Sequence, residues 1–283
     1  MQSWLPHLCA QCEQLYALRT HSMKNVDALS SGEGEFVQSL ARGLRVLTAF
    51  SAENPRLSLA DAARLTGLTR ATTRRCLHTL MQLGYAETNG KSFQLTPRVL
   101  DLGYAYLSSA KLGEIAEPFM ETLSEQLDES VSLAVLDGTE IVYVARVPTK
   151  RIMSIGLALG SRLPAVVTSM GRILLSSLPD DELRDFLRQA KLVRYTQRTI
   201  TDRVQLEREL LAVRQQRYAL VDRELEEGLR SLAVPLANRE GRVVAALNVG
   251  TQTERVSREV LLNSILPQLR RTADHINEVL ERR

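Results

Sequence analysis

Residues 58–97 read SLADAARLTGLTRATTRRCLHTLMQLGYAETNGKSFQLTP, and this stretch decides the fold of the N-terminal part of the chain. Ser58-Leu59-Ala60-Asp61 has the spacing of a capping box and opens a short helix that ends at Gly67. Thr69 is a suitable N-cap for a second helix from Arg70 to about Leu83. A helix, a turn with glycine and another helix are the sequence form of a helix-turn-helix.

A hairpin and a preceding helix complete this predicted domain. Residues 85–88 and 91–95 flank Asn89-Gly90, the pair that favours a two-residue hairpin turn because both central residues need positive φ. The hairpin is therefore interpreted as a wing with Lys91 at its tip. Upstream, a first helix begins near Phe36, and one of its faces is apolar: Val37, Leu40, Leu44, Leu47 and Phe50.

Positive charge is concentrated in the same part of the chain. Counting Lys and Arg against Asp and Glu gives 2 and 4 in residues 1–35, 9 and 3 in residues 36–98, and 25 and 26 in residues 99–283. The net charges of the three segments are therefore −2, +6 and −1. This distribution is typical of a nucleic-acid-binding module, although a solvated basic face gives the same count.

The second helix supplies side chains that read base pairs. Arginine donates two hydrogen bonds to guanine in the major groove, and threonine bonds to bases or touches the thymine methyl group. Surface charge alone explains three arginines on an isolated helix, but the turn, the hairpin and the net charge all favour DNA binding. On a helical wheel, Thr73 lies near the buried face of this helix. Thr69 precedes the helix and is expected to cap it. The candidate contacts are Thr69, Arg70, Thr72, Thr73, Arg74, Arg75, His78 and Lys91.

Residues 1–35 show no sustained periodicity and end in a Ser/Gly/Glu-rich run at 30–35, which predicts a flexible leader. Translation from Met23 would remove most of it. Cys9 and Cys12 have the spacing of half a zinc site, but no second pair follows, so we expect neither a metal site nor a disulfide framework.

The sequence shows no sign of membrane attachment. No uncharged apolar run reaches the roughly 18 residues of a membrane-spanning helix, and the N-terminus lacks the pattern of a signal peptide. We expect a cytoplasmic protein with no membrane partner.

The remaining sequence predicts a linker and a larger domain. Residues 36–96 form the winged helix-turn-helix, and residues 97–112 a linker helix whose wide apolar surface favours packing against its twin in a dimer. Residues 113–283 predict an α+β domain with a mostly antiparallel sheet. A first helix of this domain is expected to extend to about residue 127. Further helices are expected at 179–189, 203–217 and 257–281, the last interrupted by Pro267. Strands are expected at 131–136, 141–147, 152–157, 218–222, 231–237 and 242–249.

Catalytic side chains are scarce in this larger domain. It contains no cysteine and one histidine, His275, so Ser-His and Cys-His nucleophilic systems are nearly excluded. Glu224, Glu226 and Glu227 form a charged run that is more simply a solvated loop than a carboxylate site. We therefore predict no enzyme activity and no cofactor.

A ligand pocket is predicted between residues 151 and 172. Small and hydroxyl residues surround an apolar strand there, a mixture that suits an apolar pocket with a few convergent polar groups. Thr168 and Ser169 are placed to hold a carboxylate at a helix start. A loop that simply caps the following helix explains these residues equally well.

Several segments together resemble the IclR family of transcription regulators, over about residues 36–281. They are the block from Leu40-Ala41-Arg42-Gly43-Leu44 to Gly84-Tyr85, Gly160-Ser161-Arg162-Leu163-Pro164-Ala165, Thr168-Ser169-Met170-Gly171-Arg172, and Glu224 followed by Ser231-Leu232-Ala233 and Leu236. With Arg151-Ile152-Met153-Ser154-Ile155, they resemble in particular the branch that controls the β-ketoadipate pathway and related aromatic-acid catabolism.

The resemblance implies a GAF-like C-terminal effector domain and a homodimer or homotetramer on palindromic operators in double-stranded DNA. It implies a small organic-acid effector such as β-ketoadipate, protocatechuate or 4-hydroxybenzoate. The family's effector pocket would involve Ile155, Leu163, Ser169, Met170, Leu229, Ser231 and Asn248, with Arg151, Arg162 and Arg172 as cations available to an acid. The family commonly has Gly or Ala at the position of Arg217, and an acidic residue or Ser at that of Val221.

Three classes of function are thus open. The favoured one is a regulator in which effector binding reorients paired winged helices through the linker helix. The alternatives are a small-molecule-processing enzyme fused to a DNA-binding domain, and a DNA-bound scaffold without a ligand. Activation and repression use the same parts, so the sequence does not separate them.

Overall fold

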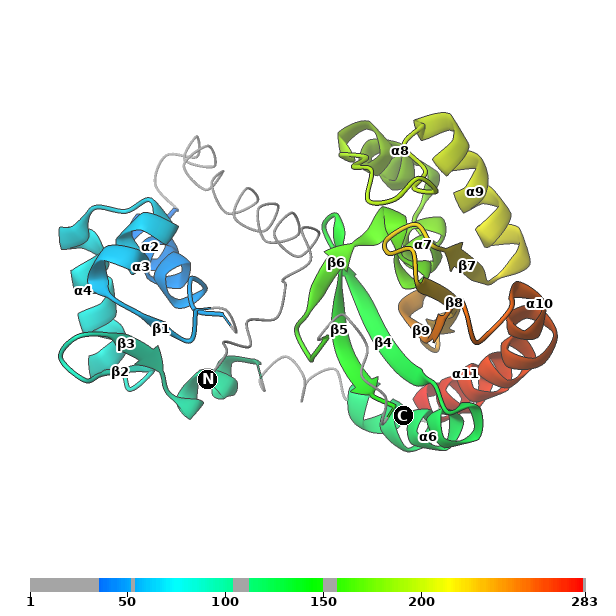
Figure 1. Cartoon of the computed structure of the whole chain (residues 1–283), viewed down its shortest axis with the longest axis horizontal. Helices are drawn as coiled ribbons and strands as arrows, with labels where there is room; N and C mark the ends of the chain where they lie inside the picture. The colour runs from blue at the N-terminus through cyan, green and yellow to red at the C-terminus, as the bar shows by residue number, and fades with distance from the viewer. Residues whose placement is uncertain (1–35, 52–53, 104–111, 150–156, 282–283) are drawn as a thin grey trace, which may run out of the picture. The chain divides into compact units, whose positions relative to one another are not determined.

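The computed structural model describes residues 36–51, 54–103, 112–149 and 157–281. The chain divides into two compact units, residues 1–109 and 110–283 (Figure 1). The expected leader, the Cys9 and Cys12 pair, nearly all of the strand at 152–157 and residues 104–111 of the expected linker helix lie outside the described residues. The described start of that linker is a 3₁₀ turn, Pro97–Val99, followed by helical residues 100–103.

Three helices form the core of the first unit: α2 (Gln38–Leu47), α3 (Leu59–Thr66) and α4 (Arg70–Gln82). The Ser58 hydroxyl accepts the Asp61 N–H at 3.1 Å, and the Thr69 hydroxyl accepts the Thr72 N–H at 3.2 Å. Gly67 separates α3 from α4 with a φ of +68°, a conformation that glycine adopts without a steric penalty. The predicted helix-turn-helix and both of its caps are confirmed.

The first helix presents a different face to the core from the one its apolar spacing indicates. Val46 and Phe50 are buried against a cluster that contains Leu77 and Leu80. Leu40 and Leu44 remain 61% and 50% exposed. The apolar stripe is therefore wider than the surface that α3 and α4 cover.

The wing is a small antiparallel sheet in the order β1-β3-β2, made of Arg56–Leu57 (β1), Ala86–Thr88 (β2) and Phe93–Leu95 (β3). The prediction of a two-residue turn is wrong, because Thr88 pairs with Phe93 and four residues lie between them. Asn89 acts through its side chain, whose Oδ1 accepts the N–H groups of Lys91 (3.0 Å) and Ser92 (2.9 Å). These side-chain hydrogen bonds stabilise the four-residue loop in place of the tighter two-residue turn.

The second unit is built on a six-stranded sheet in the order β6-β5-β4-β9-β8-β7. Every described pair of neighbouring strands is antiparallel, as predicted. The short edge strand β6 was not predicted. The strands are β4 (Ser130–Asp137), β5 (Glu140–Val147), β6 (Arg162–Pro164), β7 (Ala219–Asp222), β8 (Leu229–Ala237) and β9 (Val243–Gln252).

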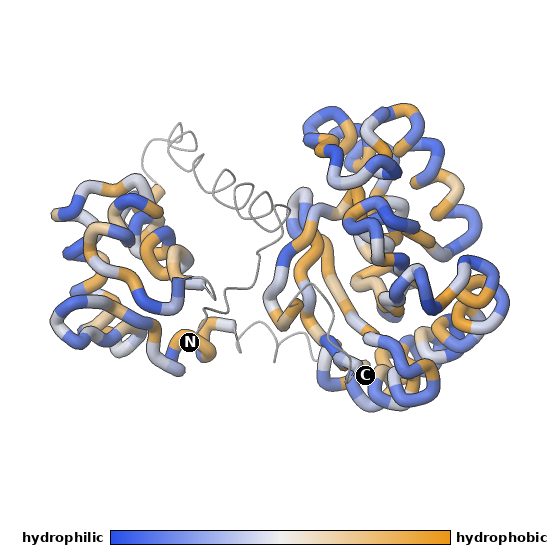
Figure 2. The backbone as a smooth tube through the Cα atoms, in the orientation of Figure 1, coloured by the Kyte–Doolittle hydropathy of each residue, from blue (hydrophilic) through white to orange (hydrophobic). Residues whose placement is uncertain are grey.

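Helices cover both faces of this sheet (Figure 1). On one face, α6 (Leu112–Leu127) and α11 (Leu266–Glu281) enclose a core that includes Val131, Leu133 and Leu247. On the other face lies α7 (Ser169–Ser176), with α8 (Asp180–Gln189) and α9 (Arg203–Gln216) further out. The strands are mainly apolar and the outer turns of α9 mainly polar, as expected for a helix at the surface (Figure 2).

Two local features explain departures from simple helix patterns. The last helix was predicted to be interrupted at Pro267. The interruption is a π-helical turn just before this proline, at Leu261–Ile265, between α10 (Arg258–Val260) and α11. Proline has no N–H for the regular helical hydrogen bond, so the preceding turn widens. Arg217 ends α9 with a φ of 55°, which is the physical reason why Gly suits this position. No helix in the described ranges is both long and apolar enough to cross a membrane.

Candidate DNA-reading helix and effector cavity

The exposed face of α4 is basic. Arg70, Arg74, Arg75 and His78 are exposed, and Lys91 is exposed at the wing tip. Helix α4 contains no acidic residue that would neutralise this face. The arrangement matches a recognition helix, whose first turns face base edges while a wing lies along the backbone.

Threonines of α4 have structural roles that limit their use in DNA contacts. Thr73 is completely buried, and its hydroxyl donates to the Thr69 carbonyl at 3.0 Å. It cannot reach a duplex, so its prediction as a DNA contact is corrected. Thr69 is exposed but its hydroxyl serves as the helix cap, and Thr72 is half-buried beside it. Arg56 and Arg98 are further exposed cations of this unit to which the sequence analysis assigned no role.

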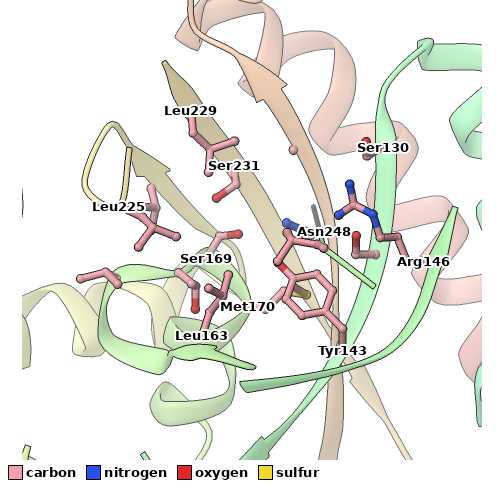
Figure 3. A pocket seen from close by; sticks show the side chains of 16 residues that line it. Ser130, Tyr143, Arg146, Leu163, Ser169, Met170, Leu225, Leu229, Ser231 and Asn248 are labelled. Carbon is pink, nitrogen blue, oxygen red and sulfur yellow. The ribbon is translucent and has the colours of Figure 1, made fainter. Parts of the chain in front are cut away.

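The second unit contains a cavity on the sheet face that carries α7 (Figure 3). The cavity is narrow, with a volume of about 40 Å³, and it is partly open to solvent. In Figure 3, Arg146 lies toward one end, Leu225 and Leu229 toward the other, and Asn248 between them. The lining residues are Ser130, Ser132, Tyr143, Arg146, Leu157, Leu163, Val167, Thr168, Ser169, Met170, Val221, Leu225, Leu229, Ser231, Asn248 and Gly250.

The strand register explains why this end of the sheet is hollow. Ser132 pairs with Arg146 on one side and with Asn248 on the other, and Gly250 pairs with both Ser130 and Ser231. Cross-strand partners point to the same face, so these small or polar side chains share one surface. A Cβ atom added to Gly250 would meet no atom within 4 Å. The opposite face of the same strands is apolar and tightly packed.

A β-bulge in β5 brings Tyr143 and Arg146 to the same cavity. Leu133 pairs with Ala145 and Ala134 with Tyr143, so Val144 is left without a partner. In a regular strand, positions 143 and 146 would point to opposite faces. The extra residue reverses the alternation, and both side chains face the cavity. Burial raises the pKa of Tyr143 to about 12, so its phenol stays protonated near neutral pH.

Two buried polar atoms in the cavity, Ser169 Oγ and Asn248 Oδ1, have no hydrogen-bond partner within the described part of the chain. Their residues are only 1% and 7% exposed. An unsatisfied buried polar group costs about 1–3 kcal/mol, so such atoms are rare in folded proteins unless a ligand or water completes them. Ser169 belongs to α7 and Asn248 to β9, and both line the middle of the cavity (Figure 3). This part of the cavity is therefore a hydrogen-bonding site.

Most of the predicted effector residues line this cavity. They are Leu163, Thr168, Ser169, Met170, Leu229, Ser231 and Asn248. Arg151 and Ile155 lie outside the described residues. Arg162 does not line the cavity, because its guanidinium binds Asp137 and also Glu140, at 2.7 Å. The Thr168 hydroxyl accepts the Gly171 N–H at 3.1 Å and caps α7, as the alternative interpretation proposed.

The acidic run at 224–227 is not simply a solvated loop. Glu224 is buried and binds Arg172 with an Nη2–Oε2 distance of 2.6 Å, and Arg172 is itself 1% exposed. The Arg172 Nε also donates to the Val166 carbonyl at 3.1 Å. Arg172 is thus a structural cation behind the cavity wall and not a free partner for an acid. Sequence reasoning missed this pair, because its partners lie 52 residues apart.

Other lining residues were also missed, among them Ser130, Ser132, Tyr143, Arg146 and Gly250. A signal for two of them exists in the sequence. The strand was predicted at 131–136, and Ser130 directly precedes it. Ser130 and Ser132 occupy alternate positions, so they share one face if the strand begins one residue earlier, while Val131 and Leu133 share the other. Polar residues on one face of an otherwise buried strand indicate a cavity or solvent on that side.

A winged helix with a basic recognition helix, joined in one chain to a domain that encloses a partly polar cavity, defines a ligand-responsive transcription regulator. Comparison with protein families gives its lineage. The model for the IclR helix-turn-helix domain matches residues 39–90, and that for the bacterial transcriptional regulator IclR C-terminal domain matches residues 104–278. The chain belongs to the IclR family of bacterial transcription regulators.

Characterised relatives fit this assignment. The chain is similar to the Pca regulon regulatory protein of Pseudomonas putida, with 46% identity over 87% of this chain and 84% of that protein. It is 40% identical to the p-hydroxybenzoate hydroxylase transcriptional activator of Acinetobacter baylyi, over 87% and 93% of the two chains. A solved IclR homologue from Microbacterium hydrocarbonoxydans, complexed with 4-hydroxybenzoate, is 25% identical, with a TM-score of 0.77 over 87% of this chain and all of that one. The relatives are regulators and not enzymes.

Proposed function

We propose that the chain controls genes of aromatic-acid catabolism and that a small organic acid in the cavity sets its activity. The observation that carries this proposal is the pair of buried atoms, Ser169 Oγ and Asn248 Oδ1, which line one cavity and have no hydrogen-bond partner among the described residues. A ligand with a hydroxyl group would satisfy both, because a hydroxyl donates one hydrogen bond and accepts others.

The relatives favour an aromatic acid among the possible ligands. The Microbacterium homologue holds 4-hydroxybenzoate, and the Pseudomonas and Acinetobacter relatives are named for the Pca regulon and for p-hydroxybenzoate hydroxylase. The candidate effectors for this chain are 4-hydroxybenzoate, protocatechuate and β-ketoadipate. The apolar residues Met170, Leu163 and Leu229 supply the wall against which a ring or a carbon chain would pack.

A screen for ligand binding tests this function. Each acid is added to the full chain and the melting temperature is measured, because a ligand that binds the folded state alone stabilises it by RT ln(1 + [L]/Kd). The expected result is a melting temperature that rises with the logarithm of the acid concentration above Kd, without chemical change of the acid. Chemical turnover would instead support an enzyme, and no shift with any of the three acids would contradict the proposed effector class.

DNA recognition is proposed to use paired copies of α4. Arg70, Arg74 and Arg75 would contact base edges, His78 a phosphate, and Lys91 the backbone beside the wing. A homodimer, or a homotetramer built from two dimers, would place two such helices on a palindromic operator, and the segment 97–112 would couple their spacing to effector binding.

Gel-shift titration with DNA from the chain's own promoter region tests this placement. Arg70→Ala and Arg74→Ala are expected to weaken operator binding by about 1–3 kcal/mol each and to relax sequence preference. Lys91→Ala should weaken binding to all sequences and lower the salt dependence by about one phosphate contact. Arg188→Ala, an exposed arginine of the other unit, is the matched control and should change nothing. Unchanged affinity in the first three variants would refute the placement.

A further inference from the structure

One residue of the cavity, Arg146, is positively charged and has no partner among the residues that the structure describes. Among the described residues that line the cavity it is the only cation, and no Asp or Glu is among them. Arg146 is half-buried on β5, and it makes no hydrogen bond or ion pair within the described part of the chain. Burial lowers its pKa, and the guanidinium nevertheless stays charged because arginine is not deprotonated in proteins.

Other shielded arginines of this unit have carboxylate partners. Arg172 binds Glu224 at 2.6 Å, and Arg230 binds Asp222 at 2.9 Å. This is the usual solution, since a charge withdrawn from water needs a counter-charge or several hydrogen bonds. Arg146 differs in that no carboxylate of the described residues pairs with it.

The side chain is also aimed at the cavity and held there by the backbone. The bulge at Val144 places Arg146 on the face of Ser132 and Asn248, and Figure 3 shows it reaching from β5 toward the interior. Two strand spacings, about 10 Å, separate the backbones at Arg146 and Asn248. An acid of one ring or a short carbon chain is long enough to reach from a guanidinium at one side to the Asn248 Oδ1 at the other.

We propose that Arg146 binds the carboxylate of the effector and that Asn248 and Ser169 bind its hydroxyl or other polar group. This proposal rests on the proposed function, because it requires an acid in the cavity. A carboxylate accepts two parallel hydrogen bonds from a guanidinium, which fixes its orientation as well as its position. The cavity therefore recognises the acid group through Arg146 and not through Arg162 or Arg172.

Calorimetric titration of the full chain with 4-hydroxybenzoate, protocatechuate and β-ketoadipate tests the proposal, with 4-hydroxybenzamide as the neutral analogue of the first. Arg146→Gln is expected to weaken binding of the acids about ten- to a hundredfold, the loss of one charge-assisted hydrogen-bonded pair. Binding of the amide should change less than threefold. Arg162→Gln, an arginine of the neighbouring strand with its own carboxylates, is the matched control and should leave both ligands unaffected.

A stability measurement separates ligand binding from a structural role. Because Arg146 has no described partner, the ligand-free Arg146→Gln chain should melt no lower than the parent chain, and Arg146→Lys should retain part of the affinity for the acids. Equal loss of the acid and the amide, a lowered melting temperature without ligand, or unchanged acid binding in Arg146→Gln would each overturn the role of Arg146. If the parent chain binds none of the three acids, the proposed function fails together with this assignment.

Discussion

Removal of the buried Glu224 carboxylate should destabilise the second unit strongly. In the folded chain, Glu224 Oε2 lies 2.6 Å from Arg172 Nη2 and also accepts the Ile200 N–H at 3.2 Å. Arg172 is 1% exposed, so Glu224→Ala would leave its charge buried with one distant partner, Glu209, at 3.7 Å. Losing one partner of a buried pair costs about 3–5 kcal/mol, and the remaining Glu209 contact places the expectation near the lower value.

The effect of this pair can be separated from the effect of lost packing. Glu224→Gln keeps the shape and one acceptor oxygen, so it should cost less than Glu224→Ala, about 2 kcal/mol. The double variant Arg172→Met with Glu224→Leu removes both charges and should recover most of the loss, because an apolar pair of similar size avoids the desolvation penalty. Asp137→Ala breaks a half-exposed pair with Arg162 and is the control, with an expected cost below about 1 kcal/mol.

Equilibrium unfolding of the full chain in urea, followed by circular dichroism, measures these free energies in the transition of the second unit. A cost below about 1 kcal/mol for Glu224→Ala would refute the argument that the pair is buried and structurally required. A double variant no more stable than Glu224→Ala would refute the argument that the uncompensated charge is the cause.

Three further changes test other parts of the structure. Gly250→Ala places its Cβ in open space at the cavity floor and should weaken effector binding at unchanged melting temperature; equal affinity, in calorimetry against Gly228→Ala as control, would argue against a ligand there. Arg217→Gly should raise the free energy of unfolding by about 1 kcal/mol, because it relieves a positive φ, and a decrease in urea unfolding would contradict this. Tyr143 has a folded pKa of about 12 against 10.0, so its contribution to stability is complete below pH 10 and falls by up to about 3 kcal/mol as pH rises to 12; Tyr143→Phe should flatten this alkaline loss.

Local sequence patterns were sufficient for the DNA-binding unit. Ser58 and Thr69 cap α3 and α4 as predicted, and Thr73, Leu77 and Leu80 form the buried stripe of α4. These features depend on residues within one or two helical turns, so their spacing is visible in the sequence. For the first helix, the apolar spacing predicted the wrong buried face. The local sequence does not encode how much of an apolar stripe the neighbouring helices cover. Leu40 and Leu44 therefore remain exposed, although the apolar spacing placed them on the buried face.

The cavity shows the opposite balance between sequence and tertiary structure. By itself, the sequence determined two domains, the basic reading helix, the antiparallel strands and the segment at Thr168 and Ser169 that opens α7. Only the tertiary structure decided which cations are free. Arg162 and Arg172 are neutralised by carboxylates from other strands or loops, whereas one unpaired residue in β5, Val144, turns Arg146 into the cavity. Charge pairing and strand register depend on partners distant in the chain, and these are fixed only when the sheet assembles.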